Sequence, residues 1–150
     1  MTEIGDKFYR EIMEKSGEWD NTDEIVEIPS IGNLRNVILL KKSFNCVIYY
    51  LTSQVKISPK KSYKEFWNFS QKGILSLKEK MGDKFVVVFL IDWDKGYLVY
   101  PSDLQKRLEE LPLVKGYYKV NERDLISGKV YSFKNTDELI DLLSRYKVER

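Results

Sequence analysis

The sequence contains no histidine and only one cysteine, and both shortages exclude whole classes of chemistry. Without histidine there is no Ser-His-Asp or Cys-His nucleophile system and no His-ligated zinc site. A single cysteine cannot form an internal disulfide, a zinc ribbon or a CxxC redox pair. Cys46 lies in an apolar run, so we expect a buried, reduced thiol of a cytoplasmic protein. Any catalysis must therefore depend on carboxylates, lysine, tyrosine or a hard metal ion such as Mg²⁺.

Long apolar runs are also missing from the chain. No stretch approaches the length of a membrane span, and the N-terminus MTEIGDKFYR lacks the apolar core of a signal peptide. These features predict a protein without a membrane partner. The length of 150 residues and the hydrophobic content of 43% predict one globular domain over residues 1–150.

Acidic residues are absent from one long window of the sequence. From Ile28 to Lys64 there are seven basic residues and no Asp or Glu, whereas residues 1–29 carry a net charge of −6. A surface formed by this window would attract a polyanion, and a lysine-rich solvated surface is the simpler alternative. The candidate nucleic-acid-binding residues are Arg35, Lys41, Lys42, Lys60, Lys61 and Lys64.

The spacing of apolar residues predicts the order of helices and strands. Helical spacing predicts helices over residues 4–15, 60–82, 102–111 and 135–146, with Ser62, Ser102 and Thr136 as N-caps and Gly82 as a stop. Runs rich in β-branched and aromatic residues predict a hairpin over 36–40 and 46–58, a central strand over 84–91 with a neighbour after it, and edge strands over 116–120 and 129–133. This order predicts an α/β fold with a mixed sheet flanked by helices.

The predicted order, with SQVKIS at the end of the hairpin, resembles the core of the PD-(D/E)XK nucleases. The closest similarity is to archaeal Holliday-junction resolvases and Mrr-like restriction enzymes, and it covers roughly residues 4–104. The resemblance implies a restriction-endonuclease-like fold. In that family an Asp on one strand, and a Glu or Gln two residues before a Lys on the next, bind Mg²⁺. An acid on the first helix often joins them.

The family's motif is transferred to this chain residue by residue. Gln54 and Lys56 match its second half, and Glu11 matches the acid of the first helix. The Asp position falls on Asn36, or on Asn45 in a shorter register. The resemblance therefore implies Glu11, Asn36, Gln54 and Lys56 as the catalytic set.

The missing acids decide what this set implies. A hard divalent cation needs anionic oxygen ligands, and no Asp lies between Glu27 and Gln54. The resemblance thus implies a DNA-binding protein whose Mg²⁺-dependent hydrolysis is weakened or lost, and which pairs into a homodimer through its edge strands. One alternative is an active Mg²⁺-dependent endonuclease that uses Glu11 with Glu27 or Glu65 as metal ligands. Another is a non-enzymatic protein-interaction subunit whose basic window docks an acidic protein.

Two further patterns each allow two interpretations. Asp92-Trp93-Asp94 follows a buried strand, where an acid pair could bind Mg²⁺, but Asp94-Lys95-Gly96 favours a hairpin turn. An aromatic group beside the lysines of residues 60–64 could stack on bases, but its spacing favours core packing. That group consists of Tyr63, Phe66, Trp67 and Phe69.

Overall fold

The computed structural model describes residues 3–17, 36–40, 43–53 and 66–149. A five-stranded mixed sheet has the order β1-β2-β4-β5-β8, and a three-stranded antiparallel sheet has the order β3-β7-β6. The strands are β1 (Val37–Leu40), β2 (Cys46–Thr52), β3 (Phe66–Ser70), β4 (Phe85–Asp92), β5 (Lys95–Val99), β6 (Leu113–Val114), β7 (Tyr117–Asn121) and β8 (Tyr131–Phe133). The helices are α1 (Glu3–Lys15), α2 (Gln71–Met81), α3 (Pro101–Glu110), α4 (Glu122–Ile126) and α5 (Thr136–Glu149). The predicted α/β fold with a mixed sheet flanked by helices is confirmed.

The most apolar stretch of the chain forms β4, the central strand of the five-stranded sheet. Six consecutive residues of β4, Phe85–Leu90, are buried, as expected of a strand covered on both faces. β2 lies parallel to β4 on one side, and β1 pairs with β2 as the predicted antiparallel hairpin. β5 pairs with β4 in antiparallel register on the other side.

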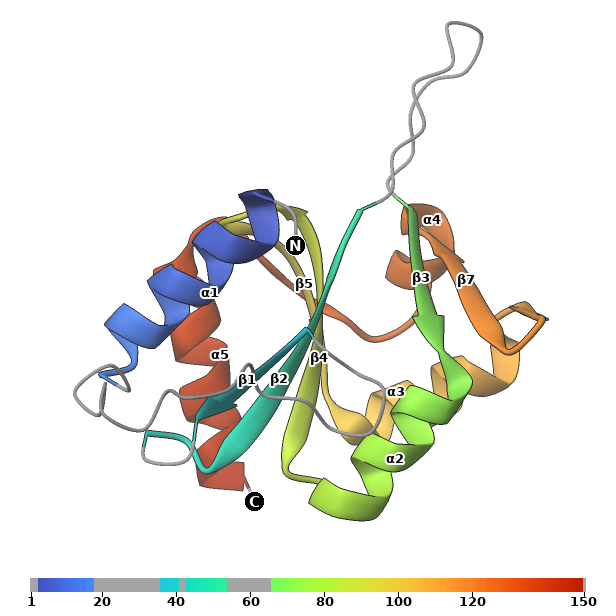
Figure 1. Ribbon diagram of the computed structural model, residues 1–150, viewed down its shortest axis with the longest axis horizontal. Coiled ribbons are helices and arrows are strands. Elements are labelled where there is room, and N and C mark those ends of the chain that lie inside the picture. The colour runs from blue at the N-terminus through green and yellow to red at the C-terminus, as the bar shows by residue number, and fades with distance from the viewer. Residues whose placement is uncertain (1–2, 18–35, 41–42, 54–65, 150) are drawn as a thin grey trace, which may run out of the picture.

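Alternating side chains of the central sheet divide the core into two halves. One half holds Ile48 and Tyr50 of β2 together with apolar residues of α1 and α5. The other holds Tyr49 of β2 together with Trp67 of β3 and apolar residues of α2 and α3. Figure 1 shows the same arrangement, with α1 and α5 on one side of the sheet and α2, α3, β3 and β7 on the other.

The predicted helix over residues 60–82 is wrong for residues 66–70, and its part before residue 66 lies outside the described residues. Residues 66–70 form β3, in which buried Trp67 and Phe69 alternate with partly exposed neighbours. This strand pairs with β7, so cross-strand hydrogen bonds replace the helical ones. The helix begins only at Gln71, and Gly82 ends it as predicted. Its N-cap is Ser70 and not Ser62, because the Ser70 hydroxyl accepts a hydrogen bond from the Gly73 amide at 3.1 Å.

Two other predicted caps also differ from the structure. α3 begins at Pro101, one residue earlier than expected, and its N-cap residue Tyr100 makes no side-chain hydrogen bond, so Ser102 is not the cap. Proline suits this first position because its ring presets the helical φ. At α5 the capping side chain is Asn135, which accepts a hydrogen bond from the Glu138 amide at 2.9 Å. Thr136 is instead a buried residue of the first turn.

The edge strands were predicted correctly in only one of two cases. β7 pairs with β3 on one side and with β6 on the other, so residues 116–120 are not an edge. The two-residue strand β6 was too short to produce a pattern of its own. β8 ends the order of the five-stranded sheet and pairs with β5, as an edge strand should.

Two hydrogen bonds join the two sheets at one end. The Phe66 amide, at the start of β3, donates to the Ser53 hydroxyl just after β2 at 3.1 Å. The Trp67 indole Nε1 donates to the Leu90 carbonyl of β4 at 3.0 Å. From this junction β2 and β3 diverge, as Figure 1 shows.

Two smaller predictions concern the whole described chain. Cys46 is buried, as expected, and as the single cysteine of the sequence it forms no internal disulfide. Within the ranges that the structure describes, no helix is both long enough and apolar enough to cross a bilayer.

Candidate functional site

A cavity of about 620 Å³ lies where the two sheets diverge. Its wall comes from the beginning of the β1–β2 hairpin, from β3, from the first turn of α2 and from the turn between β6 and β7. Cavities of this size suit a small ligand or one unit of a polymer. The cavity is therefore the strongest candidate site in the described part of the chain.

The charged residues among the described lining of the cavity are both lysines. Lys72 comes from the first turn of α2, and Lys115 comes from the β6–β7 turn. The described lining includes no Asp or Glu, and no ion pair between described residues involves either lysine. Two ammonium groups without a neighbouring carboxylate attract an anionic ligand.

A hydrogen bond holds the two lysines in one wall. The Gln71 amide, at the start of α2, donates to the Gly116 carbonyl in the β6–β7 turn at 3.0 Å. Lys72 and Lys115 each lie one residue from this bond. Their backbones are therefore fixed relative to each other although they are far apart in sequence.

Two tyrosines supply aromatic and hydroxyl groups to the same cavity. Tyr49 of β2 is buried, and its burial, followed by the nearby Tyr117, raises the pKa of its phenol. Tyr49 therefore stays a neutral hydroxyl that can both donate and accept hydrogen bonds. Tyr117 of β7 is 51% exposed, so part of its surface is open to a ligand.

Two residues of the predicted catalytic and metal-binding sets, and the alternative Asn45, lie in the described ranges. Asn36 lines the cavity, and its backbone carbonyl accepts a hydrogen bond from the Tyr50 amide at 3.0 Å. Glu11 is half-buried on α1, which covers the opposite face of the central sheet, so the structure does not bring it to the cavity. The alternative Asn45 is exposed in the β1–β2 turn with φ of 50°, and it does not line the cavity.

The remaining predicted site residues lie outside the described residues, so their assignments stay predictions. They are Gln54 and Lys56 of the catalytic set, Glu27 and Glu65 of the metal set, and the basic residues Arg35, Lys41, Lys42, Lys60, Lys61 and Lys64.

The described residues do not fit a magnesium ion. Among them, no three His, Cys, Asp or Glu side chains are grouped so that they could hold a metal. The polar lining of the cavity consists of amides, hydroxyls and two ammonium groups, and the ammonium groups repel a cation. A metal site that involves Glu27 or Glu65 remains a prediction.

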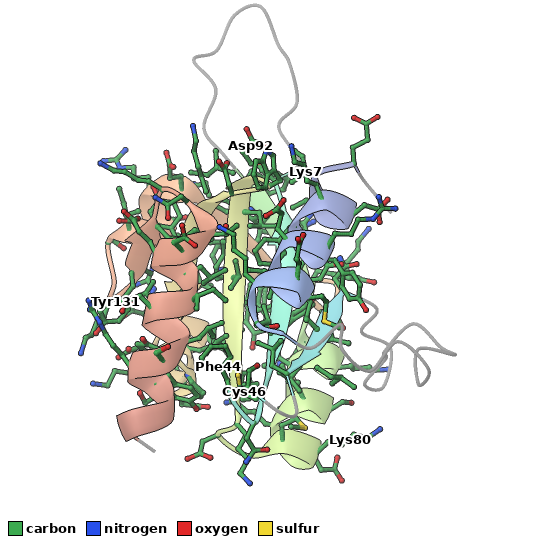
Figure 2. The ribbon with its side chains drawn as sticks, turned by 90° about the vertical axis from the view of Figure 1, so that its left-hand side faces the viewer. Lys7, Phe44, Cys46, Lys80, Asp92 and Tyr131 are labelled. Atoms are coloured by element: carbon green, nitrogen blue, oxygen red, sulfur yellow. The ribbon has the colours of Figure 1, made fainter. Side chains whose placement is uncertain are left out.

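The sequence Asp92-Trp93-Asp94 forms a turn and not a metal site. It joins β4 to β5, and the Asp92 carboxylate accepts a hydrogen bond from the Trp93 amide at 2.8 Å. The Lys7 ammonium lies 4.0 Å from the centroid of the Trp93 ring. Figure 2 shows Lys7 and Asp92 at one end of the molecule, with Phe44 and Cys46 toward the other end.

The predicted aromatic group belongs mainly to the core. Trp67 and Phe69 are buried, and each makes an edge-to-face contact with Phe89, with ring centroids 5.5 Å and 6.0 Å apart. Core packing is thus confirmed for these two residues. Phe66 is half-buried at the junction of the sheets, and Tyr63 lies outside the described residues.

The sequence did contain a partial signal for the residues that were missed. In LVKGYYKV, a Lys-Gly pair separates two short apolar runs, which is typical of a two-residue hairpin turn. That signal places Lys115 in a turn. It does not reveal that this turn contacts the start of α2, because that contact depends on the pairing of β3 with β7.

Comparisons with family models, curated proteins and solved structures find no match to this chain. The resemblance to PD-(D/E)XK nucleases rests on the sequence pattern of residues 4–104, and no comparison adds to it. The geometry and charge of the cavity provide a separate starting point for inferring a function.

Proposed function

We propose that the protein binds nucleic acid, with DNA preferred, through the cavity lysines together with the lysines of the basic window. The observation that carries the proposal is the pair Lys72 and Lys115 in a cavity whose described lining has no carboxylate. Phosphate groups are recognised by lysine as a point charge and by hydroxyl and amide donors, all of which line this cavity. The preference for DNA comes from the sequence resemblance.

The connection of the last part of the basic window to the sheets supports the same proposal. This part lies within residues 54–65, which contain four lysines and one acid and connect Ser53 to Phe66. These two residues are hydrogen-bonded to each other, and Phe66 begins β3, which lines the cavity further along. The window is thus attached to the same strand as the cavity, and its lysines would extend a phosphate-binding surface.

We further propose that Mg²⁺-dependent hydrolysis is weakened or lost. The cavity offers Asn36 where a nuclease of the resembled family has an Asp, and Glu11 lies on the other face of the sheet. The described residues around the cavity include no carboxylate, so they supply no ligand set for two-metal cleavage of a phosphodiester. A homodimer, if one forms, would have the edge strand β8 available for pairing, whereas β7 is already paired on both sides.

Binding is tested by fluorescence anisotropy with labelled duplex, single-stranded and four-way-junction DNA over a range of NaCl concentrations. Each phosphate contact releases counterions, so the log–log slope should be about −0.9 per contact on duplex DNA. We expect the variant Lys60→Glu/Lys61→Glu/Lys64→Glu to lose most of its affinity. The same samples with Mg²⁺ or Mn²⁺ should show no cleavage.

A control variant with the same change in net charge tests whether the loss of DNA affinity depends on where the lysines lie. Lys106, Lys129 and Lys134 are exposed and lie outside the cavity, and their change to Glu alters the net charge equally. This control should retain most of the affinity.

Three outcomes would contradict parts of the proposal. Wild-type affinity of the Lys60→Glu/Lys61→Glu/Lys64→Glu variant would refute the basic window as the interface. Cleavage that disappears in Lys56→Ala would refute the loss of hydrolysis. Failure to bind any DNA would favour the acidic-protein alternative.

A further inference from the structure

The turn that carries Lys115 has an unusual backbone for a lysine. Lys115 and Gly116 form the two-residue connection between β6 and β7, with φ of 52° and 84°. Such turns favour Asn, Asp or Gly at the first position, because a Cβ with a long side chain is disfavoured at positive φ. A lysine therefore destabilises this turn relative to asparagine, and strain of this kind is concentrated at functional positions.

The strained turn holds its lysine over the cavity. The hydrogen bond from the Gln71 amide to the Gly116 carbonyl ties the turn to α2, whose second residue is Lys72. Lys72 and Lys115 thus come from separate elements to the lining of one cavity, and neither pairs with a carboxylate of the described residues. This arrangement suits a single phosphate group approached from two sides.

The residue that follows the turn offers a surface for an aromatic ligand. Tyr117 lines the cavity with Lys115 and is half-exposed, and the buried Tyr49 and Phe69 belong to the same lining. A tyrosine face stacks on any nucleobase without regard to sequence. The neutral hydroxyl of Tyr49 and the side-chain amide of Asn68 add hydrogen-bonding groups for a base or sugar.

We propose that the cavity binds one unstacked nucleotide, with its phosphate at Lys72 and Lys115 and its base against Tyr117. The volume of about 620 Å³ is sufficient for one nucleotide, but a base that remains paired and stacked in a duplex cannot enter. The protein therefore prefers single-stranded or unpaired positions. The claim that the nucleotide is part of a polymer rests on the nucleic-acid binding proposed above.

The first test measures binding of mononucleotides to the full chain by calorimetry, with AMP, adenosine and inorganic phosphate as probes. AMP should bind most tightly, because it alone supplies both the phosphate and the base. Tyr117→Ala should weaken AMP binding by about 5- to 100-fold, as expected for loss of base stacking, and leave phosphate binding unchanged. Tyr131→Ala provides the control, since this half-buried tyrosine of β8 does not line the cavity.

A second test uses the strain at the turn to separate binding from stability. Lys115→Asn should raise the melting temperature by about 1–3 °C, because asparagine tolerates positive φ, and yet weaken AMP binding. Lys115→Arg should keep the binding. A merely structural role for Lys115 predicts that Lys115→Asn improves stability and leaves binding intact, and that result would overturn the proposal.

The outcomes distinguish this inference from the broader function. Salt-dependent DNA binding without AMP binding, and with no effect of Tyr117→Ala on single-stranded DNA, would refute the nucleotide cavity and leave nucleic-acid binding standing. AMP binding without any DNA binding would refute nucleic-acid binding and leave the nucleotide cavity standing. A preference for single-stranded over duplex DNA that Tyr117→Ala abolishes would support both.

Discussion

Tyr50 is the side chain whose surroundings most clearly link packing to pH. It projects from β2 toward α1, where its ring lies 5.3 Å from that of Phe8, and it is 2% exposed. Burial, followed by the charge of Asp6 and the nearby Tyr9, raises the pKa of its phenol to about 12. The folded protein therefore strongly favours the neutral form of this group.

This shift predicts a loss of stability at high pH. The phenol ionises near pH 10 in the unfolded chain, so the free energy of unfolding should be unaffected below about pH 10 and fall between pH 10 and about 12. Tyr50→Phe removes the titrating group and should lose less stability than wild type over that window. Urea unfolding at a series of pH values measures the difference. An unchanged alkaline slope in Tyr50→Phe would contradict the assignment.

The β3–α2 segment shows why the sequence predicted some elements and not others. In YKEFWNFSQKGIL, apolar residues fit both a helical period and, over FWNFS, a strand period. The choice is made by pairing with β7, nearly fifty residues later along the chain. Elements whose pattern fits one period, such as α1 and β4, were predicted within one or two residues.

The position of the helix start gives a direct prediction for this segment. Ser70→Ala removes the hydroxyl that accepts from the Gly73 amide and should lower the free energy of unfolding by about 1 kcal/mol. Ser62→Ala should cost almost nothing, since α2 begins at Gln71. Chemical denaturation of the two variants checks this. A larger loss in Ser62→Ala would indicate a helix that begins near residue 60.

The candidate site was less predictable than the fold because its parts come from distant segments. Positive charge over residues 28–64 was visible in the sequence, and so was Asn36. The sequence indicated a turn at Lys115 but no link between Lys115 and Lys72, because the two segments meet through the contact between Gln71 and Gly116. The basic residues predicted from the sequence lie outside the described residues, and tertiary contacts decide which groups share the cavity.

The whole molecule consists of two sheets that meet at one end and separate at the other (Figure 1). At the meeting point, Ser53 and Phe66 are hydrogen-bonded although residues 54–65 lie between them in the chain. The indole of Trp67 reinforces the junction through its bond to the Leu90 carbonyl. The ends of the intervening segment are thus fixed by the two sheets themselves.

This geometry predicts that the intervening segment affects binding more than folding. Replacing residues 54–65 with a short Gly/Ser linker should shift the melting temperature by only a few degrees, because Ser53 and Phe66 on either side are held together, and shortening a connection between fixed ends changes the closure entropy little. DNA affinity should fall strongly, since four lysines are lost. A Gly/Ser segment of the original length separates the effect of charge from that of length. Unfolding of both replacements would contradict this prediction.

The junction of Ser53 with Phe66 also has a consequence for how such a protein changes over generations. The free energy cost of connecting two fixed ends rises only with the logarithm of the number of residues between them. Connections of different length and composition at this point should therefore change the stability of the core little. If the segment contacts nucleic acid as proposed, variation there would alter recognition while the contacts of the core stay the same. Specificity and stability would then be separate heritable traits, and selection could act on one while the other stays constant.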